Sequence, residues 1–242
     1  MSQHCEVPMR EAMVADRRQS GFVNPLRIHK SLTADVEKRA LKWMARRTPA
    51  AINSDHLTGL GFVSQLLAGA SYALASQGAW ALLLASFFLV LNWLGDSLDG
   101  TLARVRDQQR PRYGFYVDHI ADTFGALALM LGLAYSGYVH WQIAAGMLVC
   151  FYVLSIESFL TTYTMGHFHL SQGIFGPTEI RILLIVGNAV LLVNRYADIF
   201  GHRILVFDIG GAVAIAGMLY MAVAATVRHI AVLYREEKLD DC

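Results

Sequence analysis

Long apolar segments constrain this chain more than any other feature of its sequence. Six of them follow one another, over residues 57–75, 80–96, 114–138, 141–164, 180–193 and 209–233. Most are about as long as a membrane-spanning helix requires. Hydrophobic residues make up 55% of the 242 and charged residues 16%, a balance too apolar for an ordinary soluble domain. We therefore predict an all-α integral membrane protein with about six transmembrane helices.

The first fifty residues differ from the rest because they hold half of the lysines and arginines. Between residues 34 and 47, apolar residues recur at nearly helical spacing opposite a basic face, and Thr33 is a suitable N-cap. This pattern predicts a juxtamembrane amphipathic helix, either lying on the cytoplasmic leaflet or packed on the membrane domain. We expect a cytoplasmic arm with this helix over residues 1–50 and a membrane domain over residues 51–242.

Basic residues near the ends of the predicted spans indicate the orientation of the chain. They gather between the second and third spans and at the C-terminal end, at Arg104, Arg106, Arg110, Arg112, Arg228, Arg235 and Lys238. The short loops near Gln77 and Gly137 have none. The positive-inside rule then predicts that both termini and the 104–112 loop are cytoplasmic. Arg195 and Arg203, in the predicted outer loop, go against this rule.

Four aspartates interrupt the apolar sequence where the second span ends and the third begins. Asp96 and Asp99 are three residues apart, and Asp118 and Asp122 are four apart, so each pair lies on one face of a helix. If the two helices are antiparallel neighbours, the pairs face each other across a gap. Carboxylates at this depth are costly unless they have a function. An oxygen-only site suits Mg²⁺ or Mn²⁺ and does not suit zinc.

The residues around these aspartates suit a phosphorylated substrate. Hard cations held by aspartates usually serve phosphate chemistry. Gly100 and Ala103 would let a nucleotide or pyrophosphate approach the helix backbone, and Arg104 offers a planar set of donors for phosphate. Asp122 lies deepest in the third span and is the predicted general base, which takes a proton from the attacking hydroxyl.

The motif D-x-x-D-G-x-x-A-R, followed after nine residues by G-x-x-x-D-x-x-x-D, resembles the signature of the CDP-alcohol phosphotransferase family. Its positions are filled by Asp96, Asp99, Gly100, Ala103, Arg104, Gly114, Asp118 and Asp122. The resemblance implies a membrane enzyme that transfers a phospho-alcohol from a CDP-linked donor to a hydroxyl and releases CMP. It also implies two divalent metal ions and a homodimer.

The resemblance assigns roles by position. Asp96, Asp99 and Asp118 would bind metal, and Asp122 would lie near the metals and act as the base. The CDP moiety would be held by Asp96, Gly100, Ala103, Arg104, Gly114 and Thr58. Thr58 fits the threonine of a P-N-x-x-T element that often precedes the first span in this family, whereas Asp55 stands where asparagine is commoner.

Residues outside the motif are expected to form the acceptor pocket. The stretch from Gly176 to Arg181 resembles a Thr-Glu element of the aminoalcohol branch, which transfers choline or ethanolamine phosphate to diacylglycerol. A phosphorylated acceptor, such as glycerol phosphate or inositol phosphate, would need basic groups instead. The candidates for these basic groups are Arg112 and Arg181, and Glu157 and Glu179 are the other candidates for the acceptor pocket. Glu157, in the middle of the fourth span, would either line the active-site cavity or bond a neighbouring helix.

We predict transfer of a phosphatidyl group from CDP-diacylglycerol to an acceptor hydroxyl in phospholipid biosynthesis, in contact with membrane lipid and without nucleic acid. A CDP-choline or CDP-ethanolamine:diacylglycerol phosphotransferase is the alternative within the family. A cation transporter would explain the buried aspartates but not Gly100, Ala103, Arg104 and Gly114. An intramembrane prenyltransferase would need a second aspartate cluster, and Asp198 and Asp208 are isolated in the sequence.

Overall fold

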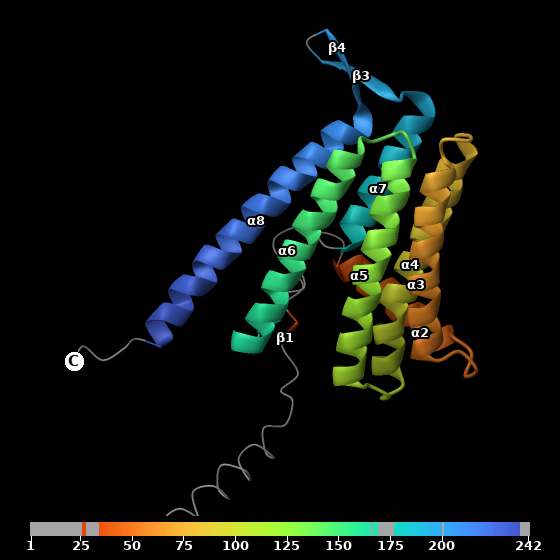
Figure 1. The fold of residues 1–242 in the computed structure, drawn as a ribbon. Helices are drawn as coiled ribbons and strands as arrows, with labels where there is room; N and C mark the ends of the chain where they lie inside the picture. The colour runs from red at the N-terminus through yellow and green to blue at the C-terminus, as the bar shows by residue number, and fades with distance from the viewer. Residues whose placement is uncertain (1–25, 28–33, 166, 169–176, 200, 238–242) are drawn as a thin grey trace, which may run out of the picture.

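The computed structural model describes residues 26–27, 34–165, 167–168, 177–199 and 201–237. Helices dominate them: α2 (Ala34–Arg47), α3 (Ser54–Leu74), α4 (Trp80–Val105), α5 (Pro111–Tyr135), α6 (Trp141–Met165), α7 (Pro177–Val193) and α8 (Val206–Glu236), shown in Figure 1. The strands β1 (Leu26–Arg27) and β2 (His167–Phe168) pair in parallel. The strands β3 (Tyr196–Ile199) and β4 (His202–Leu205) form an antiparallel hairpin. Most of the predicted arm, residues 1–25 and 28–33, lies outside the described residues.

Five of the described helices, α3, α4, α5, α6 and α8, are long and apolar enough to cross a membrane. The prediction of an all-α membrane protein is confirmed. The predicted fifth span, 180–193, falls within α7, which has 17 residues. At a rise of about 1.5 Å per residue, α7 reaches roughly 25 Å, somewhat less than the hydrocarbon core of a bilayer.

Glycines allow α3 to pack closely against two neighbours. A Cβ built on Gly95 of α4 would lie 2.5 Å from the backbone nitrogen of Gly61, and one built on Gly132 of α5 would lie 1.9 Å from the carbonyl oxygen of Gly69. Neither position has room for a side chain. Within the described residues, α4 and α5 make little direct backbone contact with each other, whereas both pack on α3. The two helices that carry the motif, α4 and α5, are therefore held in place by their packing on α3.

A buried polar network fixes α7 against α3 and α4. The hydroxyl of Tyr72 donates to Oδ1 of Asn188 over 2.9 Å, and Nδ2 of Asn188 donates to Oγ of Ser86 over 2.9 Å. Tyr72 and Asn188 are almost fully buried. Buried polar groups are stable when they are paired in this way. The network sets the position of α7, whose first turns carry Glu179 and Arg181.

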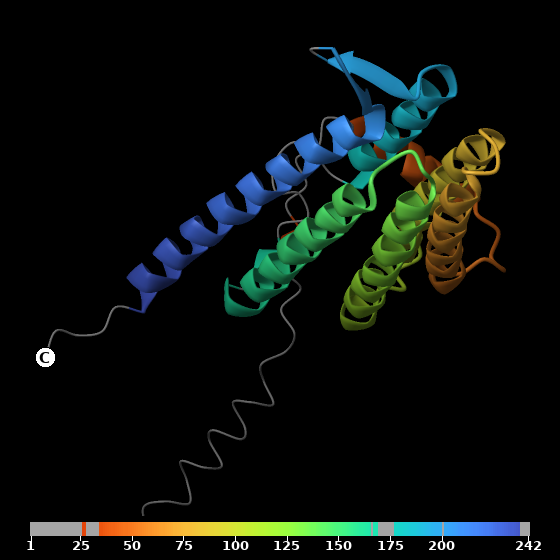
Figure 2. The same cartoon turned by 45° about the horizontal axis from the view of Figure 1, so that its top comes forward.

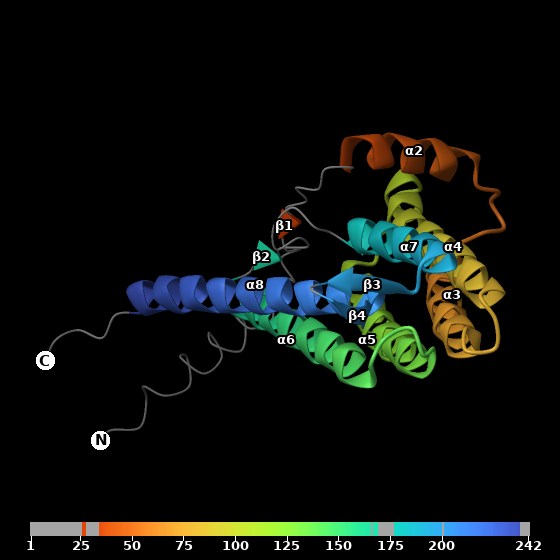
Figure 3. The ribbon, with the colours of Figure 1, turned by 90° about the horizontal axis from the view of Figure 1, so that it is seen from above.

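The predicted amphipathic helix is present as α2, and its apolar face packs on the membrane helices. Leu41 and Ala45 are buried in a small cluster with Leu57, Leu98 and Leu102. Oε1 of Glu37 accepts hydrogen bonds from Trp93 and Ser97 on α4 and from Thr178 on α7. Figure 3 looks down on the bundle and shows α2 lengthwise at its edge, beside α4 and α7.

The opposite side of the molecule is more open. α6 packs on α5 and α8, and α8 runs beside α6 and away from α3, α4 and α5 (Figure 2). The chain between α7 and α8, which was predicted to be an outer loop, contains the β3–β4 hairpin. Gly201 adopts a φ of +82° at its turn, a conformation that favours glycine. Arg195 lies at its base and stacks on Tyr138 and Tyr196.

Candidate active site

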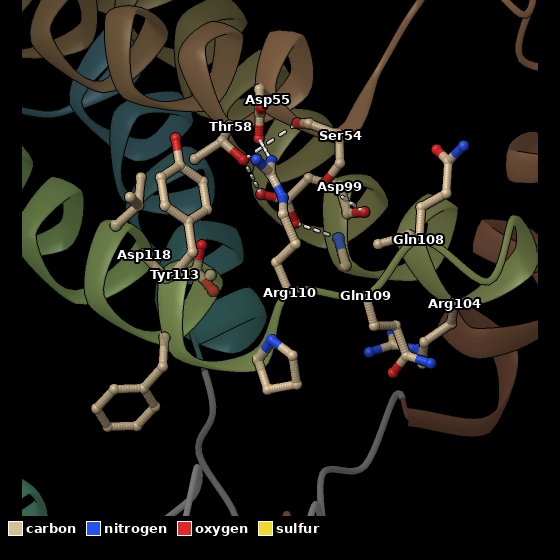
Figure 4. Close-up of a pocket in the computed structure, with 16 residues that line it drawn as sticks. Ser54, Asp55, Thr58, Asp99, Arg104, Gln108, Gln109, Arg110, Tyr113 and Asp118 are labelled. Carbon is tan, nitrogen blue, oxygen red and sulfur yellow. Dashed lines mark hydrogen bonds and ion pairs between the residues drawn. The ribbon is translucent and has the colours of Figure 1, made fainter. Parts of the chain in front are cut away.

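A cavity of about 370 Å³ opens where α4 ends and α3 and α5 begin. We call it the outer cavity (Figure 4). The turn between the two motif helices borders it, with Asp107 in the left-handed region at φ 54° and Pro111 at the start of α5. Its lining includes the predicted site residues Thr58, Asp99, Gly100, Ala103, Arg104, Gly114 and Asp118. The structure therefore gathers seven of the predicted site residues around one opening.

A narrow inner cavity adjoins the outer one, and Thr58, Asp99 and Asp118 line both. Asp96 and Asp122 also line the inner cavity, so all four motif aspartates surround it. They are close enough for their charges to act on one another. The two pairs face each other across a gap, as their spacing predicts, although α3 rather than direct packing of α4 on α5 sets that gap.

Hydrogen bonds hold the carboxylate of Asp99 in place. The hydroxyl of Thr58 donates to its Oδ2 over 2.6 Å, and the backbone N–H of Gly100 donates to its Oδ1. Ser54 donates from Oγ to the carbonyl oxygen of Asp99 over 3.1 Å. Because Ser54 and Thr58 belong to the first turns of α3, this helix start and the motif are held as one unit.

Arg181 joins α7 to the motif. Its Nη2 donates to Oδ2 of Asp96 over 2.8 Å, and its Nε donates to Oδ1 of Asn92 over 2.7 Å. Asn92 is buried and donates from Nδ2 to the carbonyl oxygen of Gly61 over 2.9 Å. Sequence reasoning missed Asn92, although its position four residues before Asp96 places it on the same face of α4.

The mouth of the outer cavity carries residues that the motif does not predict. Arg110 forms an ion pair with Asp55, and its guanidinium lies 4.3 Å from the centroid of the Tyr113 ring. Gln108 and Gln109 complete this edge. Figure 4 shows Tyr113 and Asp118 on one side of the cavity and Gln108 and Arg104 on the other. The polar composition of the 106–110 turn is the feature of the sequence that could have indicated this edge of the cavity.

The two motif glycines face open space. A Cβ built on Gly100 would meet only the guanidinium of Arg104, at 3.5 Å, and one built on Gly114 would meet no atom within 4 Å. Both residues line the outer cavity. Packing within the protein therefore does not require glycine at either position, and a side chain there would occupy the cavity itself.

The acceptor-pocket candidates lie in different places. Arg181 lies at the motif, and Glu179 is buried near the start of α7. Arg112 is exposed on α5 and does not line either cavity. Glu157 lies between α6 and α8, where it accepts a hydrogen bond from Thr161 and pairs with the ring of His229. Gly176, which opened the predicted Thr-Glu element, lies outside the described residues.

Comparison with known proteins agrees with this geometry. Residues 53–227, which contain both cavities, match the model of the family described as CDP-alcohol phosphatidyltransferase. The chain belongs to this family of transferases. It is also 30% identical over 104 residues to an archaetidylinositol phosphate synthase of Pyrococcus horikoshii. That match covers 43% of this chain and 52% of the archaeal protein, so it spans about half the length of the curated relative.

The CDP-alcohol phosphatidyltransferase family is generally dependent on divalent metal ions. The inner cavity suits such ions in its chemistry, because its carboxylates, the Thr58 hydroxyl and the amides of Gln65 and Asn92 supply oxygen donors. Within the described part of the chain, however, no three Asp, Glu, His or Cys side chains converge as a ready metal site. Asp96 and Asp99 instead bond Arg181 and Thr58.

Proposed function

We propose that this protein transfers a phosphatidyl group from CDP-diacylglycerol to the hydroxyl of an alcohol acceptor and releases CMP. The hydroxyl oxygen attacks the phosphorus that carries the diacylglycerol, the bond from that phosphorus to the bridging oxygen breaks, and CMP leaves. The main support is the pair of adjoining cavities in a member of this family. A donor in the outer cavity would bring its diphosphate to Asp99 and Asp118, which line both cavities.

The outer cavity suits the CDP portion of the donor. Gly100 of α4 and Gly114 of α5 have no side chain, which leaves room for the CDP portion in this cavity. Arg104 and Arg110 place two guanidinium groups in the lining, which favours phosphate. Thr58 and Ala103 add small side chains to the same wall.

Asp96, Asp99, Asp118 and Asp122 would hold Mg²⁺ or Mn²⁺, with two ions expected from the family resemblance. Bound metal would neutralise phosphoryl oxygens and stabilise the departing phosphate. The four carboxylates also repel one another in the inner cavity, and Arg181 offsets part of that repulsion. A cation in the cavity would remove more of it.

Asp122 is the proposed general base, because it lines the inner cavity beside the other three aspartates. Its carboxylate would accept the proton of the acceptor hydroxyl as the new phosphorus–oxygen bond forms. Arg181 lies close enough for its positive charge to act on Asp122. We assign Arg181 to the acceptor side of the site.

The acceptor is proposed to be a phosphorylated alcohol. The name of the archaeal relative describes a product in which a lipid group is joined to inositol phosphate. This name favours a lipid on the CDP donor and a phosphate on the acceptor. We place the site and both termini on the cytoplasmic side, as the distribution of arginines predicts, and propose that the protein acts as a homodimer.

The test is CMP release by purified protein in nanodiscs with Mg²⁺ or Mn²⁺. CDP-diacylglycerol is offered with inositol phosphate, glycerol phosphate, inositol, glycerol and serine, and CDP-choline and CDP-ethanolamine are offered with diacylglycerol. We expect CMP only from CDP-diacylglycerol, most rapidly with a phosphorylated acceptor and not after addition of EDTA. Turnover of CDP-choline or CDP-ethanolamine with diacylglycerol would instead establish the aminoalcohol reaction.

A further inference from the structure

The face of α2 that points away from the bundle carries four cations and a tryptophan. Arg39, Lys42, Trp43, Arg46 and Arg47 line a surface pocket of about 330 Å³, which we call the basic face. Trp43 is 56% exposed, and the guanidinium of Arg47 lies 4.0 Å from its ring centroid. Among the described residues, none of these four cations has an acidic partner. Within the part of the chain that the structure describes, no carboxylate offsets their charge.

The opposite side of α2 prevents this face from turning inward. Leu41 and Ala45 are buried against Leu98 and Leu102 of α4. Glu37 accepts hydrogen bonds from two residues of α4 and one of α7. Rotation of α2 about its axis would break these contacts and expose the apolar side chains. The outward direction of the basic face is thus determined by the fold.

The position of α2 suits contact between the basic face and lipid headgroups. Figure 3 shows α2 lying along the edge of the bundle rather than within it. Leu41 and Ala45, which lie between the basic residues along α2, pack with Leu98 and Leu102 in the last two turns of α4, whereas the contact of Glu37 with Trp93 lies near the middle of that membrane-spanning helix. Tryptophan is enriched near lipid headgroups, and lysine and arginine there meet the phosphates of the lipids.

We propose that the basic face of α2 binds the headgroups of anionic phospholipids in the surrounding bilayer. Four neighbouring cations with no acidic partner among the described residues favour an anionic ligand, and an exposed tryptophan between them favours one that also has an apolar portion. Soluble anions supply only the first of these. The proposal does not depend on the identity of the donor or the acceptor, because the basic face lies outside both cavities.

The first experiment compares thermal unfolding of the full-length protein in detergent with added dioctanoyl phosphatidylglycerol or dioctanoyl phosphatidylcholine. We expect phosphatidylglycerol to raise the unfolding midpoint at about tenfold lower concentration. Arg39→Gln/Lys42→Gln/Arg46→Gln should abolish this preference. Two control variants should retain the preference for phosphatidylglycerol. One is Arg228→Gln/Arg235→Gln, which removes exposed cations from α8, and the other is Arg39→Lys/Arg46→Lys, which keeps the charge of the basic face. Inorganic phosphate should have little effect.

The second experiment detects the lipid at Trp43 directly. The protein is placed in nanodiscs that contain equal fractions of brominated phosphatidylglycerol or brominated phosphatidylcholine, and quenching of tryptophan emission is measured. The difference in quenching between the wild-type protein and Trp43→Phe gives the contribution of Trp43. We expect stronger quenching by the anionic lipid, and equal quenching by the two lipids in the triple glutamine variant.

Three results would overturn the proposal. The first is an equal response of the wild-type protein to the two lipids. The second is a preference for the anionic lipid that persists in the triple glutamine variant, and the third is loss of that preference in Arg228→Gln/Arg235→Gln as well. A strong effect of inorganic phosphate would assign the basic face to a soluble anion. Because these measurements use neither a CDP donor nor turnover, they are independent of whether the proposed transferase reaction is correct.

Discussion

Arg181 of α7 bonds Asp96 of α4 through an ion pair of 2.8 Å, with 11% of the arginine side chain exposed. The same guanidinium reaches Asn92, one turn earlier on α4. Asp96 shares the inner cavity with three other carboxylates, so the positive charge of Arg181 offsets part of their mutual repulsion. α7 is therefore part of the site, although none of its residues belongs to the motif.

Replacing Arg181 tests this connection. Arg181→Gln leaves Asp96 without its ion-pair partner, so we expect a loss of about 1–3 kcal/mol in stability and at least about tenfold slower CMP release. Arg181→Lys keeps the charge but cannot form the same two bonds, and should recover stability only partly. Arg112→Gln, at an exposed position outside the cavities, is the control. Wild-type unfolding and turnover in Arg181→Gln would contradict the assigned role.

Gly100→Ala is predicted to weaken binding of the donor without unfolding the protein. The new methyl group would enter the outer cavity and meet only Arg104, at 3.5 Å. We expect the KM for CDP-diacylglycerol to rise about tenfold while the unfolding midpoint stays equal or rises slightly, because alanine favours a helix. Gly59→Ala on α3 is the matched control, since its Cβ would meet no atom within 4 Å. An unchanged KM would remove Gly100 from the donor site.

Asp122→Asn tests the assignment of the base. The amide is close in size to the carboxylate but accepts no proton, so we expect CMP release to fall by about 10²–10⁴-fold. Donor affinity, measured by binding of labelled CDP-diacylglycerol, should change little. Asp208→Asn, at the start of α8 where Asp208 pairs with His140, is the control outside both cavities. Turnover near the wild-type rate would exclude Asp122 as the base.

Glu157→Gln should separate a structural role from an acceptor role. Glu157 accepts a hydrogen bond from Thr161 and pairs with His229, and so joins α6 to α8. We expect its replacement to lower stability by about 1–3 kcal/mol and to leave the KM of the acceptor unchanged. Glu236→Gln at the exposed end of α8 is the control. A changed acceptor KM with normal stability would return Glu157 to the acceptor pocket.

Gly95→Ala tests the close contact between α3 and α4. The new Cβ would lie 2.5 Å from the nitrogen of Gly61, so the two helices must move apart. We expect a loss of about 1–3 kcal/mol in stability, together with slower turnover because Asp96 is the next residue. Gly210→Ala on α8 meets no atom within 4 Å and should leave both properties near the wild type. A normal unfolding midpoint in Gly95→Ala would contradict the tight crossing.

Apolar length and helical periodicity were enough to predict the helices and the shared face of each aspartate pair. Apolar length located the helices, and offsets of three and four placed each aspartate pair on one face. The grouping of Asp96, Asp99, Asp118 and Asp122 around one cavity also requires that α4 and α5 both pack on α3, which periodicity does not show. The residue roles and the metal remain predictions.

The features that the sequence did not predict depend on tertiary contacts. The partnership of Arg181 with Asp96 depends on how α7 packs, and a local pattern carries no information about that packing. Arg112 and Arg181 looked equivalent as basic residues near span ends, yet only Arg181 reaches the inner aspartates. The β3–β4 hairpin was missed because its strands are four residues each and follow a long apolar helix.

Because α3 packs on both α4 and α5, its contacts with these two helices set the distance between the two aspartate pairs. A Cβ built on Gly61 would lie 3.2 Å from the backbone nitrogen of Asp96 in α4, and one built on Gly69 would lie 2.4 Å from the carbonyl oxygen of Ala128 in α5. A larger residue at Gly61 or Gly69 would push the neighbouring helix away from α3. We expect this to widen the distance between the aspartate pairs without altering any aspartate. The distance between the two aspartate pairs therefore depends on a helix that contributes no residue to the motif.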